Sequence, residues 1–137
     1  MNTLGKSERL NSRKQIALLF SKGQGFVCFP YSVRWVRVGE EPSSVPPVRV
    51  LFSVTKRRFK HAVDRNRVKR VTRECYRLHK NDLYSRLAAS AEAPLLLSLS
   101  YIDNQLPDFH QSMQRFDTLV ERLLKDLRHE PSAEDHI

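Results

Sequence analysis

The segment from Lys56 to Lys80, KRRFKHAVDRNRVKRVTRECYRLHK, constrains the fold of this chain more than any other part of it. It holds 11 of the 24 Lys and Arg residues but only two of the 15 acidic residues, so its net charge is +9 and the remainder is neutral. Charge clustered in this way produces the long-range field of a polyanion-binding surface. Nucleic acid is therefore the first candidate for a partner.

The second part of this segment predicts an amphipathic helix. From Asp64 onward neither Pro nor Gly interrupts the sequence, and Asp64 is expected to be the N-cap. At about 100° per residue, the apolar side holds Val68, Val71, Cys75 and Leu78. The opposite side is basic and consists of Arg65, Asn66, Lys69, Arg70, Arg73, Arg77 and Lys80. Like charges four residues apart repel by about a few tenths of a kcal/mol per pair, which disfavours the alternative of a passive solvated face.

Hydrophobic periodicity predicts further helical structure on both sides of the basic helix. A short helix over 12–22 ends at Gly23, which is a good helix stop. The segment Asn81–Ser90 is expected to continue the basic helix after a bend. A long helix over Asp108–Arg128 carries an apolar residue at every third or fourth position, as expected for a helix that packs on a core.

Three segments read as extended structure. Phe26–Val38 is rich in Val and aromatic residues and is broken at Pro30, and Val48–Val54 follows it to form a hairpin. Pro94–Ile102 reads as a buried strand that runs parallel to Val48–Val54, because a helix separates the two. These elements predict an α+β sandwich of order α-β-β-β-α-β-α, in which helices pack on a small mixed sheet and the basic helix lies in a β-α-β crossover.

The length of 137 residues fits one domain, which we expect to span residues 1–128, followed by a polar and disordered tail over 129–137. The N-terminus has no signal-peptide pattern, and no apolar run is long enough to cross a membrane. Cys28 and Cys75 match no metal spacing, and Cys75 falls on the apolar side of its helix. A reduced, cytoplasmic protein without a membrane partner is the expectation.

No pattern for catalysis or cofactor binding stands out. The five histidines are scattered without metal-ligand spacing, and the four glycines form no phosphate-binding loop. Acidic residues are sparse where a nucleic acid would lie, so a protein nuclease with metal-binding carboxylates is not indicated. The sequence predicts a binding protein with no catalytic residue, metal ligand or cofactor motif of its own.

A run of residues in the basic helix resembles the signature of the bacterial ribonuclease P protein family. The run is Arg65-Asn66-Arg67-Val68-Lys69-Arg70, followed by Arg73-Glu74. The resemblance extends upstream through Ser53-Val54-Thr55-Lys56-Arg57 and Ala62, and downstream through Tyr76-Arg77. It includes Arg9-Leu10 and a first helix with Ile16 and Phe20 that ends at Lys22-Gly23. The order of elements fits the family over roughly residues 7–128.

This resemblance implies an activity and its partners. The holoenzyme of the family removes the 5′ leader from precursor tRNA by hydrolysing one phosphodiester bond. The catalytic centre belongs to a large RNA subunit and its bound Mg²⁺. The protein subunit binds that RNA and holds the leader, and no obligate protein partner is implied.

The resemblance also implies roles for individual residues. Contacts to the RNA subunit are expected from Arg65, Asn66, Arg67, Lys69, Arg70 and Arg73 on the helix and from Lys56, Arg57, Arg58 and Lys60 in the preceding loop. The side chain of Asn66 either bonds a ribose or base edge or caps the turn locally. Leader contacts are expected from Ile16, Phe20, Tyr31, Arg34 and Ser53, since single strands need stacking surfaces and nearby cations. Core packing is the alternative for both aromatic candidates, Phe20 and Tyr31, and Trp35 is assigned to the core.

Two other classes of protein fit part of the pattern. A general or ribosomal RNA-binding protein without a processing role has the same charge and size, and differs only in the motif. A DNA-binding factor would place the basic helix in a major groove, but Pro94 interrupts the heptads that a basic zipper needs. A helix-turn-helix protein would have helices on both sides of the reading helix, where strands are predicted here.

Overall fold

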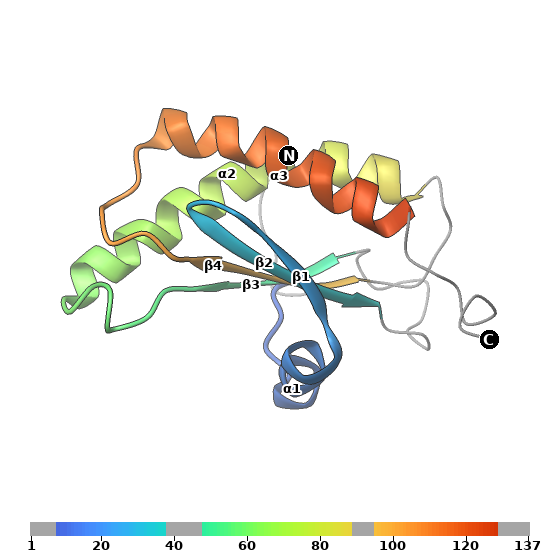
Figure 1. The fold of residues 1–137 in the computed structure, drawn as a ribbon, viewed down its shortest axis with the longest axis horizontal. Coiled ribbons are helices and arrows are strands. Elements are labelled where there is room, and N and C mark those ends of the chain that lie inside the picture. Colours follow the sequence, from blue (N-terminus) through green and yellow to red (C-terminus); the bar gives the residue numbers. More distant parts are fainter. Residues whose placement is uncertain (1–7, 38–47, 89–94, 129–137) are drawn as a thin grey trace.

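The computed structural model describes residues 8–37, 48–88 and 95–128. Within these ranges the chain forms α1 (Arg13–Lys22), β1 (Gln24–Cys28), β2 (Tyr31–Arg37), β3 (Val48–Ser53), α2 (Ala62–Ala88), β4 (Leu95–Tyr101) and α3 (Phe109–Arg128). Helices α2 and α3 cover one face of a four-stranded sheet, and α1 lies on the opposite face (Figure 1). The predicted order of elements and the α+β sandwich are confirmed. The predicted tail over 129–137 lies outside the described residues.

The strand order is β1-β2-β4-β3, so the last strand of the chain lies inside the sheet. Strand β4 pairs antiparallel with β2 and parallel with β3, and β1 pairs antiparallel with β2. The predicted parallel crossover is confirmed, but the predicted hairpin between Val48–Val54 and its predecessor is wrong. Strand β4, LLLSLSY, is buried at every position except Ser100, and such an apolar strand is stable only between two others.

The main core lies between the sheet and the two long helices. Alternate residues of β2 and β4 face this layer, and they are Tyr31, Val33, Trp35, Leu95, Leu97, Leu99 and Tyr101. Buried residues of α3, including Phe116 and Leu123, pack against them. Trp35 is therefore a core residue, as predicted. Truncating any one of these buried leucines to Ala would cost about 2–5 kcal/mol.

Helix α1 packs on the other face of the sheet through a smaller core of Leu10, Leu19 and Leu96. The Ser12 hydroxyl caps the helix by accepting from the Gln15 amide at 3.3 Å. Gly23 ends it as predicted, for a steric reason: a Cβ at this position would lie 2.2 Å from the Leu19 carbonyl oxygen. These local contacts fix where the helix begins and ends.

Helix α2 differs from the prediction in three respects. It begins at Ala62, so Asp64 lies within the first turn and is not the N-cap, and it continues to Ala88 as one element instead of breaking after Lys80. Its buried side consists of Val68, Thr72, Cys75, Tyr76, Lys80, Leu83 and Leu87. Leu78 is exposed and Lys80 is buried, the reverse of their predicted positions. The buried side of α2 extends further around the helix than predicted, because it contacts both α3 and the sheet.

Candidate nucleic-acid interface

The first half of α2 presents cations to solvent. Its basic face consists of Asn66, Arg67, Lys69, Arg70 and Arg73, of which all but the half-buried Lys69 are exposed. Within the described part of the chain, none of these four cations has an acidic side chain within ion-pair distance. Unpaired guanidinium groups can offer their full set of N–H donors to phosphate oxygens.

The loop between β3 and α2 extends this charge. Its basic residues are Lys56, Arg57, Arg58 and Lys60, hereafter the basic loop, and all but the half-buried Arg58 are exposed. Phe59 is buried and packs beside Tyr101, which anchors the loop to the core. Arg65 donates from Nη1 to the carbonyl oxygens of Phe59 and Lys60, each at 2.9 Å. Arg65 therefore fastens the basic loop to α2, a role that sequence reasoning did not foresee.

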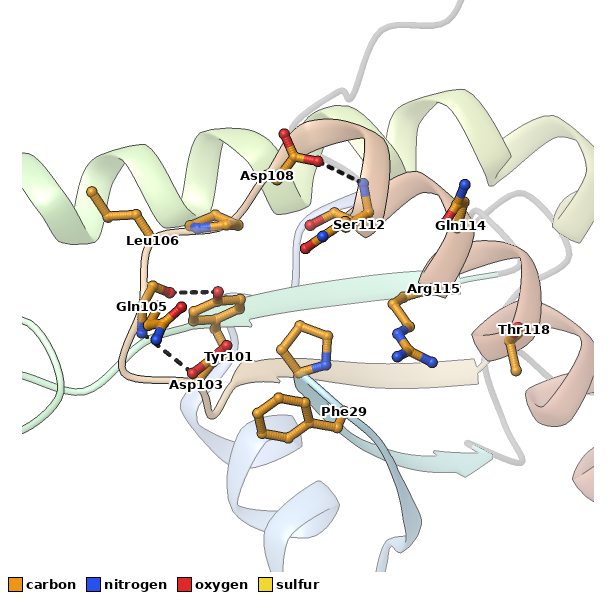
Figure 2. A pocket seen from close by; sticks show the side chains of 13 residues that line it. Phe29, Tyr101, Asp103, Gln105, Leu106, Asp108, Ser112, Gln114, Arg115 and Thr118 are labelled. Carbon is orange, nitrogen blue, oxygen red and sulfur yellow. Dashed lines mark hydrogen bonds between the residues drawn. The ribbon is translucent and has the colours of Figure 1, made fainter.

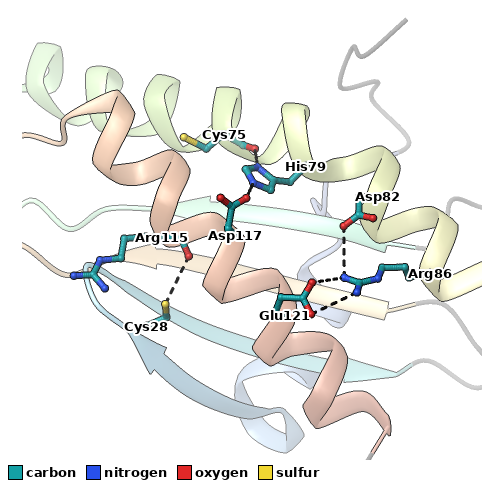
Figure 3. A network of polar contacts seen from close by, with 8 residues as sticks. All are labelled: Cys28, Cys75, His79, Asp82, Arg86, Arg115, Asp117 and Glu121. Atoms are coloured by element: carbon teal, nitrogen blue, oxygen red, sulfur yellow. Dashed lines mark hydrogen bonds and ion pairs between the residues drawn. The ribbon is translucent and has the colours of Figure 1, made fainter.

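The second half of α2 also carries cations, but these are paired. Lys80 bonds Glu8 at 3.0 Å, Arg86 bonds Glu121 at 2.6 Å, and Arg77 pairs with Glu74 one turn earlier. Figure 3 shows His79 and Arg86 reaching from α2 to Asp117 and Glu121 on α3. The hydrogen bond from Arg77 lowers the pKa of the Glu74 carboxyl. These cations join parts of the fold.

A second polar surface lies on the α1 side of the sheet. Ser100 of β4 is in register with Ser32 of β2 and with Ser53 of β3, so three hydroxyl side chains form a row across three strands. They share the face of Leu96, which packs under α1. The Ser53 and Ser100 hydroxyl oxygens lie 2.7 Å apart. Of this row only Ser53 was predicted, although the alternation of Leu and Ser in β4 was a signal for it.

An aromatic ring and a guanidinium lie beside the serine row. Phe20 on α1 is 48 % exposed, and the Arg34 guanidinium lies 5.7 Å from the centre of its ring. Arg34 also donates to the Phe20 carbonyl oxygen at 3.4 Å. Ile16, another predicted leader contact, is partly buried against the smaller core. Phe20, Arg34 and Ser53, three of the predicted leader contacts, thus share the α1 side of the sheet.

Tyr31 does not belong to this surface, and of its two predicted positions it occupies the one in the core. Its side chain is 0 % exposed and points into the main core, with its hydroxyl 3.1 Å from Thr72 Oγ1 and 3.5 Å from Ser112 Oγ. Burial raises the pKa of this hydroxyl. The signal was present in the sequence, because Tyr31 alternates with Val33 and Trp35 and must share their face.

Within the described ranges 8–37, 48–88 and 95–128, no group of three or more His, Cys, Asp or Glu side chains is placed to hold a metal ion. Burial raises the pKa of the Cys75 thiol to about 12, so it stays protonated and unreactive near neutral pH. No helix in these ranges is long and apolar enough to cross a membrane. What the two surfaces offer is binding through phosphate contacts and through stacking.

Comparison with known proteins gives consistent matches. The family model described as Ribonuclease P matches residues 4–123. The ribonuclease P protein component of Porphyromonas gingivalis is 41 % identical over 77 % of this chain and 75 % of its own length. The component from Chlorobaculum tepidum is 37 % identical over 92 % of this chain and 83 % of its own.

Solved structures share the fold at lower identity. The RNase P protein of Staphylococcus aureus superposes with a TM-score of 0.63 at 18 % identity, covering 86 % of this chain and 96 % of that one. The protein from Thermotoga maritima superposes with a TM-score of 0.63 at 20 % identity, covering 84 % and 96 %. These superpositions support the α+β architecture described above.

Proposed function

The chain belongs to the bacterial ribonuclease P protein family, and from this premise we propose that it binds the catalytic RNA through α2 while holding the 5′ leader of precursor tRNA on the α1 side of the sheet. Members of the family are protein components of a ribonucleoprotein endoribonuclease that processes tRNA. The observation that carries the proposal is the pair of surfaces described above. One is rich in unpaired cations, and the other combines hydroxyls with an exposed ring.

The basic face and the basic loop bind phosphates of the catalytic RNA. Arg67, Arg70 and Arg73 each present a planar fork that matches two phosphate oxygens. The exposed amide of Asn66 reaches a ribose or base edge between them. If about six cations each displace a counterion, log K falls with log salt at a slope near −4 to −5.

The α1 side of the sheet holds the single-stranded leader. A base stacks on the exposed ring of Phe20, the nearby Arg34 guanidinium neutralises a phosphate, and the serine row bonds sugar or phosphate oxygens. A stacked base contributes about 1–3 kcal/mol. Hydrolysis itself belongs to the RNA subunit and its Mg²⁺, in line with the family likeness, and this chain contributes binding and positioning.

Cleavage of a precursor tRNA at low Mg²⁺ tests the proposal. The purified protein is assayed with and without a bacterial ribonuclease P RNA, and activity that requires both components is expected. A protein that fails to stimulate a competent RNA would instead be a general RNA-binding protein. Cleavage by the protein alone, after contaminating nucleases are excluded, would place an active site in this chain.

The leader surface has its own test. Phe20→Ala is expected to weaken binding of the precursor to the holoenzyme at least about fivefold, and to leave binding of leaderless tRNA unchanged. Leu78→Ala, an exposed apolar residue on α2, serves as the matched control. Equal losses for both tRNA forms would show that Phe20 acts on the fold or on the catalytic RNA and not on the leader.

A further inference from the structure

A cavity of about 480 Å³ opens at one end of the sheet, and its lining is distinct from both surfaces described above. It lies between the β1–β2 turn, the loop that joins β4 to α3 and the first turns of α3 (Figure 2). None of the residues assigned to the catalytic RNA or to the leader lines it. Its volume falls within the usual range for small-ligand sites, about 300–1,000 Å³.

The walls combine a flat apolar surface with free polar groups. Phe29, at the β1–β2 turn, is 54 % exposed and forms part of the lining, as does the exposed Leu106. The side chains of Gln111, Gln114 and Arg115 also line the cavity, and they make no hydrogen bond to any other described residue. A carboxamide both donates and accepts, which is what the edge of a nucleobase requires.

Carboxylates in the lining favour a base over the phosphate backbone. Asp103 and Asp108 each use one oxygen locally, accepting from the amides of Gln105 and Gln111 at 3.3 and 3.1 Å. These two negative charges outweigh the single positive charge of Arg115, so phosphate is disfavoured, and a carboxylate oxygen accepts well from the exocyclic amino group of a base. The chemistry of the cavity therefore suits an uncharged, flat ring with donors on its edge.

The cavity adjoins the proposed RNA surface. Asn104, in the β4–α3 loop that forms one wall, accepts a hydrogen bond from Arg58 of the basic loop at 3.1 Å. RNA bound along the basic loop would thus pass the mouth of the cavity. Unpaired bases that leave a stack are the parts of RNA that proteins bind on aromatic side chains.

We propose that this cavity takes one unpaired base of the RNA bound by the basic loop and the basic face, a step that rests on the proposed function. The base stacks on Phe29, and the carboxamides of Gln111 and Gln114 bond its edge. The site would read the identity of one nucleotide, whereas the basic face binds phosphates of any sequence.

Titration of the full-length protein with the four ribonucleosides, followed by NMR of the backbone amides, tests the site itself. Nucleosides carry no phosphate, so the result does not depend on the basic face. At least one nucleoside is expected to produce saturable shifts at Phe29, Gln105 and Gln111, with affinity reduced at least about fivefold in Phe29→Ala. Phe109→Ala, an exposed aromatic at the start of α3 outside the lining, is the matched control and should bind normally. Absence of saturable shifts, or equal binding by Phe29→Ala, overturns the proposal.

A second measurement uses the assembled ribonucleoprotein. A photoreactive benzoylphenylalanine replaces Thr118, a lining residue with no role in the proposed base contacts, or, as control, the exposed Lys125 further along α3. An RNA adduct at a single unpaired nucleotide is expected from position 118 and not from position 125. A cleavage-competent complex without that adduct, or with an adduct to protein, overturns the base site. Failure of the complex to form would instead count against the proposed function, while the nucleoside titration still reports on the cavity.

Discussion

The two halves of α2 use positive charge in opposite ways. In the first half, Arg67, Arg70 and Arg73 project into solvent with no acidic partner in the described part of the chain. In the second half, Arg77, Lys80 and Arg86 each meet a carboxylate, supplied by α2 itself, by Glu8 or by α3. One continuous helix thus carries the cations that we propose bind RNA, followed by cations that hold parts of the fold together.

This difference shows that charge density alone does not identify a binding residue. The +9 segment from Lys56 to Lys80 reads as a single basic stripe, yet Lys80 at its end is buried and paired. The distinguishing property is the supply of acidic partners, and some of these come from distant parts of the chain. Mutations that remove or create such partners should therefore separate the two halves.

The largest loss of stability is expected from Lys80→Met in the second half of α2. Lys80 is 5 % exposed, the Glu8 side chain is 14 % exposed, and Glu8 accepts both from Lys80 and from the Tyr84 hydroxyl, so the substitution removes one charge of a largely buried ion pair. The free energy of unfolding should fall by about 3–5 kcal/mol in urea titrations. Arg70→Met in the first half is the matched control, with an expected change within about 0.5 kcal/mol. Similar losses for both variants would remove the distinction between the halves.

For RNA binding, substitutions in the first half of α2 are expected to have a large effect, whereas their effect on stability is small. Changing Arg67, Arg70 and Arg73 together to Ala should make the plot of log K against log salt less steep by about 2 to 3, because three phosphate contacts are lost. The unfolding free energy should be unchanged or slightly higher, since like-charge repulsion along the helix is relieved. Filter binding across a salt titration measures the slope. An unchanged slope would take the basic face out of the interface.

The pH dependence of the unfolding free energy tests whether Cys75 is buried on the inner side of α2. Burial raises the pKa of Cys75 from its ordinary 9.0 to about 12, so below pH 9 both the folded and the unfolded state keep the proton. Between these values only the unfolded chain ionises, and stability falls as the pH rises, by about 1.4 kcal/mol near pH 10. Cys75→Ala should lose this part of the pH dependence in urea titrations. Parallel pH profiles for the two proteins would contradict the assignment.

The smallest change in stability is expected when the first half of α2 is given an acidic partner for its cations. Asn66→Glu places a carboxylate one turn before Arg70, in the favourable orientation for a pair at i and i+4. Stability should rise by about 0.3–0.5 kcal/mol, while affinity for the RNA falls, because Arg70 is now paired. Asn66→Gln should change neither stability nor charge. A gain in both stability and affinity would mean that Asn66 is not at the RNA surface.

Local pattern was enough to predict most of the fold. The apolar spacing of Asp108–Arg128, the run of leucines in Pro94–Ile102 and the stop at Gly23 each depend on neighbouring residues, and the structure confirms all three. The hairpin prediction failed because nothing local to Val48–Val54 shows that a strand more than 40 residues later pairs with it. Long-range pairing is decided by the whole sheet.

For the candidate surfaces too, the sequence predicted the features that depend on neighbouring residues and missed those that depend on distant ones. The basic face was visible in the composition of one helix. The burial of Lys80 depends on Glu8, which lies 72 residues earlier, and the serine row needs the register of three strands. The position of Tyr31 is different, because its alternation with Trp35 already indicated the core side. The cavity beside Phe29 joins a turn, a loop and a helix, and no single stretch of sequence encodes it.

The central position of β4 has a consequence for how the protein is made. During translation β1 and β2 can pair as soon as both have left the ribosome. Strand β3 pairs with no other strand until β4 follows, and before that only the isolated bridge between Arg9 and Val50 can form. All of α2 is synthesised in that interval, so a nascent chain carries its cationic helix before the sheet that positions it is complete. Such non-local pairing slows folding. The sheet and the final setting of the helix are therefore acquired together, late in synthesis.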